Sequence, residues 1–197
     1  MRAPASVRLK DSCSSQRALR GRVLNILFVC TGNICRSPTA ERLTAAYAKE
    51  HVLADLAASS AGIRAVVGHP VHREAARVLR RLGGDPSNFV ARQLKPPMGD
   101  SADLVLTMTV AHREAVLERA PRLLRRTFTL SEASRLAQEA GAQTIADFPR
   151  LRSRLLAHET TDVADPMGQP EEVFEAVGTH IAALLRPLVV FLSRPPV

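Results

Sequence analysis

The chain has 197 residues, 46% of them hydrophobic and 23% charged, which excludes a disordered chain and leaves room for one packed domain. The formal net charge is +8, but residues 1–22 hold six basic residues and one acidic residue and so carry +5 of it, which argues against a nucleic-acid-binding domain in the rest of the chain. No uninterrupted run of about 18 apolar residues occurs, and the first residues lack the apolar core of a secretory signal, so we expect neither a membrane-spanning helix nor a leader.

The first predicted elements are a strand and a helix joined by a short loop. Residues 23–29 form a nearly continuous apolar and β-branched run, which is typical of a strand buried on both faces of a parallel sheet. The turn-forming residues 30–33 follow. Ser37 and Pro38 are typical of an N-cap and a first helical turn, which predicts a helix from there to about Glu50.

The alternation of strands and helices continues to the C-terminus. Such an order produces right-handed β-α-β units, so we predict an α/β fold with a doubly wound parallel sheet and a ligand site outside the carboxyl end of the first strand. We divide the chain into a basic, disordered extension at 1–22 and a single domain at 23–197. The further strands are predicted at 56–60, 103–108 and 127–130, the further helices at 71–82, 110–119 and 171–192, and mixed helical and irregular structure at 131–159.

The segment between the first strand and its helix has the residues that phosphoester cleavage needs. It contains Cys30, then five residues, then Arg36 and Ser37. A loop ahead of a helix N-terminus directs successive backbone N–H groups at one point, which favours both a phosphate and the thiolate of Cys30. The planar guanidinium of Arg36 can hold two phosphoryl oxygens, Ser37 can donate to the thiolate, and Gly32 permits the tight backbone.

A candidate general acid lies near the other end of the chain. Asp165 precedes Pro166, which stiffens the loop that carries the carboxylate, and an acid is needed to protonate the leaving oxygen. An Asp-Pro pair alone is more often an ordinary turn. Its combination with the loop at 30–37 favours the catalytic interpretation, with Asp162 as the second candidate.

Two other interpretations of these residues are less consistent with the sequence. Cys30 could be a buried strand-end cysteine with Arg36 a surface charge, but their position between a strand and a helix favours a site. A metal site formed with Cys35 and a distant histidine lacks the usual paired-ligand spacing, so we predict no metal. We interpret the histidines as surface or packing residues without a ligand-like pair: His51, His69, His72, His112, His158 and His180.

The motifs resemble those of the low-molecular-weight protein-tyrosine-phosphatase family, in the form of a bacterial-type member. The run VCTGNICRSPTAE, the SSAG at 59–62, the ARQL at 91–94 and the late Asp-Pro occur in that family's order, over about residues 23–193. The resemblance implies a three-layer α/β fold, with a four-stranded parallel twisted sheet and helices on both faces. It implies hydrolysis of phosphotyrosine in proteins through a phosphocysteine intermediate, without a metal or other cofactor.

The resemblance also assigns roles to individual residues. Cys30 would be the nucleophile, Arg36 the phosphate clamp and Asp165 the acid and then the base. In relatives the second loop cysteine, here Cys35, can trap an oxidised nucleophile as a disulfide, and a small buried side chain is an equally good interpretation. The phosphate-binding loop would comprise Thr31, Gly32, Asn33, Ile34, Cys35 and Ser37, and Ser60 would support it.

Some positions depart from the family's pattern. Met167 stands where relatives usually carry an aromatic residue after Asp-Pro, and residues 63–67 have no aromatic either, which weakens the prediction of a strong phosphotyrosine preference. Phe89 stands where a histidine is common, so part of the network that braces the loop is altered. The interval from Cys30 to Asp165 is long, which predicts a helical insert within 131–159, most simply a surface helix.

Three alternative activities and the expected surroundings complete these predictions. A protein phosphoarginine phosphatase on the same fold is the first alternative, although such enzymes tend to carry Thr where this chain has Ile34. Arsenate reductases of this fold need further cysteines, and none follows Cys35. A catalytically inactive phosphate- or nucleic-acid-binding protein has only the basic extension in its favour.

We expect a phosphorylated protein as partner, with a tyrosine kinase as one candidate, and no membrane or nucleic acid. We expect a cytoplasmic location because three cysteines are too few for a disulfide framework.

Overall fold

The structure is a computed structural model of the chain, and it describes residues 23–139, 141–156 and 161–194. The predicted extension at 1–22 and His158 lie outside the described residues.

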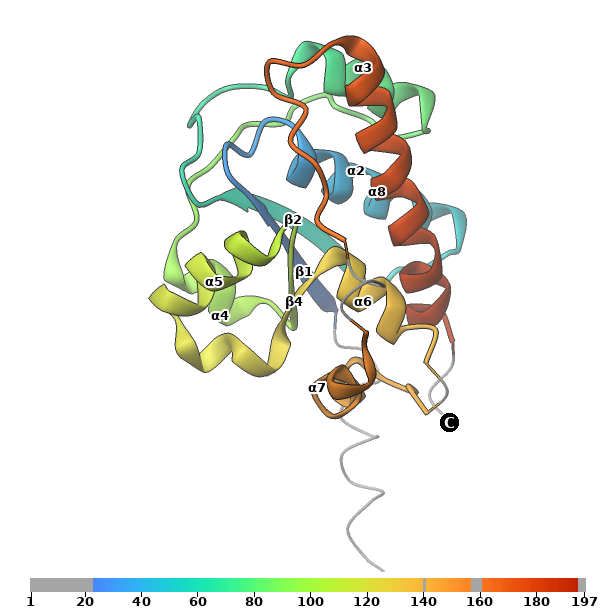
Figure 1. The fold of residues 1–197 in the computed structure, drawn as a ribbon. Helices are drawn as coiled ribbons and strands as arrows, with labels where there is room; N and C mark the ends of the chain where they lie inside the picture. The colour runs from blue at the N-terminus through green and yellow to red at the C-terminus, as the bar shows by residue number, and fades with distance from the viewer. Residues whose placement is uncertain (1–22, 140, 157–160, 195–197) are drawn as a thin grey trace, which may run out of the picture.

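A four-stranded parallel sheet forms the centre of the fold (Figure 1). Its strands are β1 (Leu24–Cys30), β2 (Leu56–Gly62), β3 (Leu104–Thr107) and β4 (Thr127–Thr129), in the order β2-β1-β3-β4. β1 therefore lies between β2 and β3, and the chain adds β2 on one side of β1 and β3 on the other. The predicted α/β class and the four parallel strands are confirmed.

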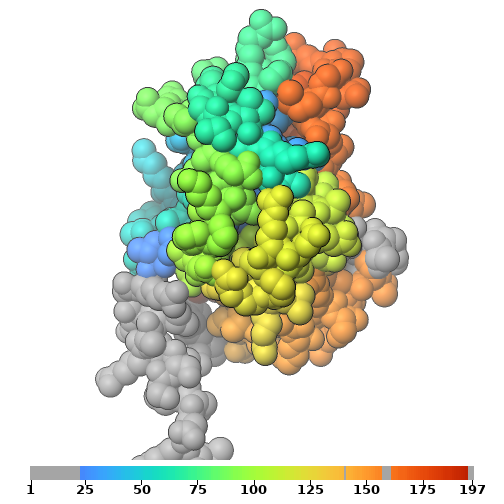
Figure 2. Space-filling view, turned by 90° about the vertical axis from the view of Figure 1, so that its left-hand side faces the viewer, coloured from blue at the N-terminus to red at the C-terminus, as the bar shows by residue number. Residues whose placement is uncertain are grey.

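Helices cover both faces of the sheet. The α-helices are α2 (Arg36–Glu50), α3 (Arg73–Arg81), α4 (Pro96–Ser101), α5 (Val110–Arg119), α6 (Leu130–Leu136), α7 (Phe148–Leu151) and α8 (Glu171–Leu192), and the 3-10 turns are η1 (Pro121–Arg126), η2 (Ile145–Asp147) and η3 (Arg152–Arg154). One face packs against α2, α6 and α8, and the other against α4 and α5. Figure 2 looks onto the second face, where the green and yellow atoms of residues around α4, α5 and η1 gather.

The alternating side chains of β1 explain this arrangement. Ile26 and Phe28 point into the core shared with α2 and α8, whereas Leu27 and Val29 point into the smaller core beneath α4 and α5. All four are almost completely buried. A strand that is buried on both faces reads as a continuous apolar run, as the sequence of residues 23–29 does.

The helix boundaries differ from the predictions at a few places. α2 begins at Arg36, and Ser37 is not its N-cap, because the Ser37 hydroxyl is hydrogen-bonded to the Cys30 sulfur instead. The short helix α4 and the turn η1 were not predicted. Both open with proline in the first turn, but they are too short to show a helical periodicity in the sequence.

The segment expected to be an insert contributes to the core. It contains α6, η2, α7 and η3, and Phe148 and Leu151 are completely buried against the sheet and α8. The interpretation of this segment as a surface helix was therefore wrong. The arrangement follows from its sequence, because the ring of Phe148 meets the rings of Phe128 and Phe191.

Within the part of the chain that the structure describes, α8 is long and apolar enough to cross a membrane by length and composition, with a mean hydropathy of 1.5. We expected no membrane-spanning helix because the sequence has no uninterrupted apolar run of sufficient length. The mean hydropathy of α8 is high although the helix contains Arg186. The core helix of a domain can have the same length and composition. Ile181, Leu185 and Leu188 are buried in the main core, where α8 packs against α2, α3 and α6.

Candidate active site

The loop between β1 and α2 is held from outside by the segment that follows β2. Three consecutive carbonyl groups of the loop point outward, toward this segment. The loop therefore curves around its opposite, inner side. An N–H group at the turn, that of Asn33, lies 3.3 Å from the Cys30 sulfur. The three hydrogen bonds, each 2.9–3.0 Å long, run from the N–H groups of Ile63, Arg64 and Val66 to the carbonyls of Cys30, Thr31 and Gly32.

Gly62, the last residue of the SSAG motif and of β2, makes this close approach possible. A Cβ atom at this position would conflict with the carbonyl oxygen of Thr31 and with the backbone of Ala65. The glycine is therefore required by the packing of the loop against the end of β2.

A directed network of hydrogen bonds reaches the thiol. The side-chain amide of Asn33 donates to Ser37 Oγ at 2.9 Å and to Ser60 Oγ at 2.8 Å. Because Ser37 Oγ accepts from Asn33, its own proton is available to the Cys30 sulfur, which lies 2.9 Å away. This geometry agrees with the roles predicted for Asn33, Ser37 and Ser60, and it provides a donor for a thiolate.

The same network extends to residues that the sequence analysis did not assign. Ser60 Oγ donates to Glu41 at 2.6 Å, and the Arg92 backbone N–H donates to the Asn33 side-chain oxygen at 2.9 Å. Burial raises the pKa of Glu41. At the position where a histidine was expected, Phe89 is buried and lies under the guanidinium of Arg42, so it takes no part in the network. Glu41 is the last residue of the motif VCTGNICRSPTAE and Arg92 lies in the motif ARQL, so their place in these motifs could have indicated a role.

Arg36 and Asp165 form an ion pair although 129 positions separate them. The Arg36 guanidinium is buried, and it donates to Asp165 at 2.5 Å and to the Val163 carbonyl at 3.2 Å. Val163 N–H in turn donates to the Met108 carbonyl at the end of β3, so the sheet positions the acid loop. The structure thus pairs the predicted clamp with the predicted acid, and the residue after the clamp, Ser37, is hydrogen-bonded to the predicted nucleophile.

A second anchor of the loop comes from α5. His112 Nε2 lies 2.8 Å from Thr31 Oγ1, and His112 Nδ1 lies 2.8 Å from Thr109 Oγ1. His112 is 5% exposed, and burial together with the charge of Arg36 lowers its pKa to about 4. The interpretation of His112 as a surface or packing residue omitted this contact with the loop.

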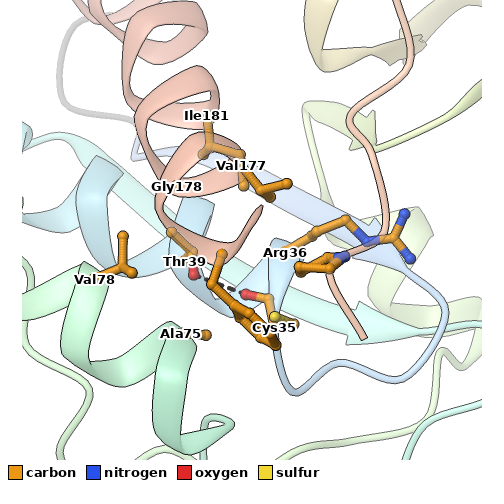
Figure 3. A pocket seen from close by; sticks show the side chains of 10 residues that line it. Cys35, Arg36, Thr39, Ala75, Val78, Val177, Gly178 and Ile181 are labelled. Carbon is orange, nitrogen blue, oxygen red and sulfur yellow. Dashed lines mark hydrogen bonds between the residues drawn. The ribbon is translucent and has the colours of Figure 1, made fainter. Parts of the chain in front are cut away.

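Cys35 faces away from the reacting side of the loop. Burial, and then the neighbouring Cys30, raise the pKa of Cys35 to about 12. It borders a small pocket between the loop, α3 and α8, and Figure 3 shows the Arg36 guanidinium pointing away from Ala75 and Val78, which line this pocket. Cys30 and Cys35 are not joined by a disulfide.

Aliphatic or sulfur-containing side chains follow Asp165-Pro166 and β2, and Ile34 of the loop is also aliphatic. Met167 is 42% exposed directly after Pro166, Val66 and Val67 are exposed after β2, and Ile34 is partly buried in the loop. Gly32 lies beside Ile34 and Val66. Over residues 23–139, 141–156 and 161–194, no group of three or more His, Cys, Asp or Glu side chains is placed to hold a metal ion.

Comparison with known proteins identifies the family. The family model described as low molecular weight phosphotyrosine protein phosphatase matches residues 25–195. The chain belongs to this family.

Individual relatives support the assignment to this phosphatase family. A protein-arginine-phosphatase from Geobacillus stearothermophilus is 32% identical over 81% of this chain and 90% of its own length. A probable low molecular weight protein-tyrosine-phosphatase, AmsI, from Erwinia amylovora is 39% identical over 78% of this chain and 86% of its own. Among solved structures, a YwlE mutant from Bacillus subtilis matches with a TM-score of 0.71 and 28% identity, over 87% of this chain and 99% of that one. The predicted family and its phosphatase activity are thus confirmed.

Proposed function

We propose that this phosphatase hydrolyses phosphotyrosine in proteins through a phosphocysteine formed on Cys30. The observation that carries the proposal is the pairing of buried Arg36 with Asp165, in a loop where the next residue, Ser37, is hydrogen-bonded to the Cys30 sulfur. This arrangement supports Cys30 as the nucleophile, Arg36 as the anion clamp and Asp165 as the proton donor.

In the first step, the Cys30 thiolate attacks phosphorus while Arg36 exchanges Asp165 for two phosphoryl oxygens. The sulfur–phosphorus bond forms, the phosphorus–oxygen bond to the substrate breaks, and Asp165 gives its proton to the leaving oxygen. In the second step the Asp165 carboxylate removes a proton from water, whose oxygen attacks phosphorus. The sulfur–phosphorus bond then breaks, and the Ser37 hydroxyl stabilises the departing thiolate.

A protein phosphoarginine phosphatase is the second candidate. Two observations favour it: the arginine phosphatase from Geobacillus stearothermophilus matches most of the chain, and Met167, rather than an aromatic residue, follows Asp165-Pro166. Ile34 in the loop favours an aryl phosphate such as phosphotyrosine as the substrate instead.

The test is turnover with EDTA present of para-nitrophenyl phosphate, a phosphotyrosine peptide and a phosphoarginine peptide, by wild type and Cys30→Ser. We expect Cys30-dependent cleavage that favours phosphotyrosine, and binding of vanadate by the serine variant. A preference for phosphoarginine would keep the mechanism and change the substrate. Turnover that survives in Cys30→Ser would reject Cys30 as the nucleophile.

The physiological partner that we propose is a phosphorylated protein, with a tyrosine kinase as one candidate, and the proposed location is the cytoplasm. The three cysteines of the chain are too few for a disulfide framework, which supports a reducing compartment. Copurification of a phosphotyrosine protein with Cys30→Ser from cytoplasm would support both points.

A further inference from the structure

One buried titratable group beside the site has no part in the mechanism above. His112 lies in the first turn of α5, on the opposite side of the loop from Ser60, and its ring spans from Thr109 to Thr31. Thr31 directly follows the nucleophile. The loop therefore has one side-chain support on the β2 side, through Asn33, and another on the α5 side, through His112.

The capping of α5 suggests a direction for these hydrogen bonds. Thr109 Oγ1 already accepts the His112 backbone N–H at 3.1 Å, as the N-cap of the helix. The single hydroxyl proton of Thr109 can then go to His112 Nδ1. In that tautomer Nε2 carries the ring proton and donates to Thr31 Oγ1, and the hydroxyl proton of Thr31 is left free for another acceptor.

The acid loop meets α5 at the same place. The Val110 backbone N–H donates to the Asp162 carboxylate at 2.9 Å, and Arg36, Asp165 and Asp162 are close enough to act on His112 through their charges. The first turn of α5 thus contacts both Thr31 and the segment that carries the acid. No other described side chain is hydrogen-bonded to the Thr31 hydroxyl.

We propose that His112 is a positioning residue that acts through Thr31, holding this side chain so that its hydroxyl donates to the phosphate ester bound in the loop. The proposal rests on the proposed function of the site. It assigns to α5 a part in the reaction that the thiol network and the acid do not supply.

A double-mutant cycle tests the connection. We expect Thr31→Val and His112→Leu each to lower kcat/KM for para-nitrophenyl phosphate about tenfold and to weaken inorganic phosphate binding, because a hydrogen bond to a charged group is lost. The double variant should be no worse than the poorer single variant. Losses that multiply in the double variant would overturn the proposal.

Conservative variants separate positioning from folding. Thr31→Ser keeps the hydroxyl and His112→Gln keeps an N–H group near the position of Nε2, so both should retain activity within about threefold. Val116→Ala, a buried change in the same helix, should lower the unfolding midpoint and leave kcat/KM unchanged. If Thr31→Val were as active as Thr31→Ser, the proposal would fail even if His112→Leu did not fold.

The proposed function and this inference fail in different ways. Absence of Cys30-dependent turnover in wild type would reject the first. Calorimetric titration with inorganic phosphate then still reports on the loop, and equal affinities of wild type, Thr31→Val and His112→Leu would reject the second.

Discussion

Asn33 combines a backbone and a side-chain contribution to the site. Its φ of 54° lies in the left-handed region, where asparagine is tolerated better than most residues. Its amide makes the two hydrogen bonds that orient Ser37 and Ser60. The turn of the loop and the orientation of the thiol's hydrogen-bond donor therefore depend on one residue.

Two substitutions should separate these contributions. Asn33→Gly keeps the left-handed backbone and loses the amide with its buried hydrogen bonds, so we expect kcat to fall about 10–100-fold and the protein to lose some stability. Asn33→Ala should lose the same activity and about 1–2 kcal/mol more unfolding free energy than Asn33→Gly. Activity assays and urea unfolding of both variants check this, and equal stability of the two would contradict it.

Asp165→Ala should reveal the general acid through its dependence on the leaving group. Aryl phosphates with poor leaving groups should slow by about 10²–10⁴-fold, and those with good leaving groups far less, because only the former need the proton. The measurement is kcat/KM across a series of substituted phenyl phosphates. Equal losses along the series would move the acid elsewhere, with Asp162→Ala as the next variant.

The pKa of His112 predicts a pH dependence of stability. Its pKa of about 4 in the folded protein lies below the usual value near 6.5, so between these values the unfolded chain binds more protons. The stability that His112 contributes through this lowered pKa is complete above pH 6.5 and is lost as the pH falls toward 4. The loss is about 1.4 kcal/mol of unfolding free energy per pH unit. Urea unfolding at pH 7 and pH 5 should show a loss about 2 kcal/mol larger for wild type than for His112→Gln.

The sequence predicts the residues that react better than the residues that support them. Cys30 and Arg36 share one short motif, and Asp165 has a proline beside it. Glu41 and His112 act through contacts made only after folding, the second of them with a residue 81 positions away. The sequence around a single glutamate or histidine in a helix does not predict such a contact.

At the scale of elements, β1 and the end of β2 form one unit with the catalytic loop. The two strands are aligned up to the pair Cys30–Gly62, so the nucleophile and the glycine lie side by side at the edge of the sheet. Strand β1 was predictable because it is apolar on both faces. The helix α4 was not, since Pro96 and Pro97 resemble a turn.

Gly62→Ala should displace the loop rather than merely weaken the fold. The added Cβ conflicts with the backbone of Thr31 and Ala65, so we expect at least a tenfold loss of kcat/KM and of phosphate affinity. Gly99→Ala is the matched control, because its close neighbour is the end of the Leu123 side chain in the other core. The control should lose stability and keep its activity per folded molecule.

At the scale of the whole molecule, the segment 131–156 is fastened to the domain by charge as well as by apolar packing. Glu132 accepts from Arg113 of α5 at 2.5 Å and from Arg152 of η3 at 2.8 Å, and it closes the capping box of Thr129. Burial alone would raise the pKa of Glu132, and these hydrogen bonds outweigh burial and lower it. Three elements distant in the sequence therefore share one carboxylate.

Glu132→Gln should lower the unfolding free energy by about 1–3 kcal/mol, because two partly buried guanidinium groups lose their counter-charge. Activity at saturating substrate should change less than twofold. Denaturant unfolding beside steady-state kinetics checks both values. Glu139→Gln, in a more exposed pair with Arg135, is the control and should cost less than about 0.5 kcal/mol.

The distance along the chain between Cys30 and Asp165 has a consequence for synthesis. Ribosomes add about 5–20 residues per second, so the thiol is made several seconds before the acid. Helix α8, which covers the sheet beside the loop, is made later still. A nascent chain that ends before residue 165 can therefore contain the nucleophile but not the catalyst, and dephosphorylation begins only when nearly the whole polypeptide has been released and has folded.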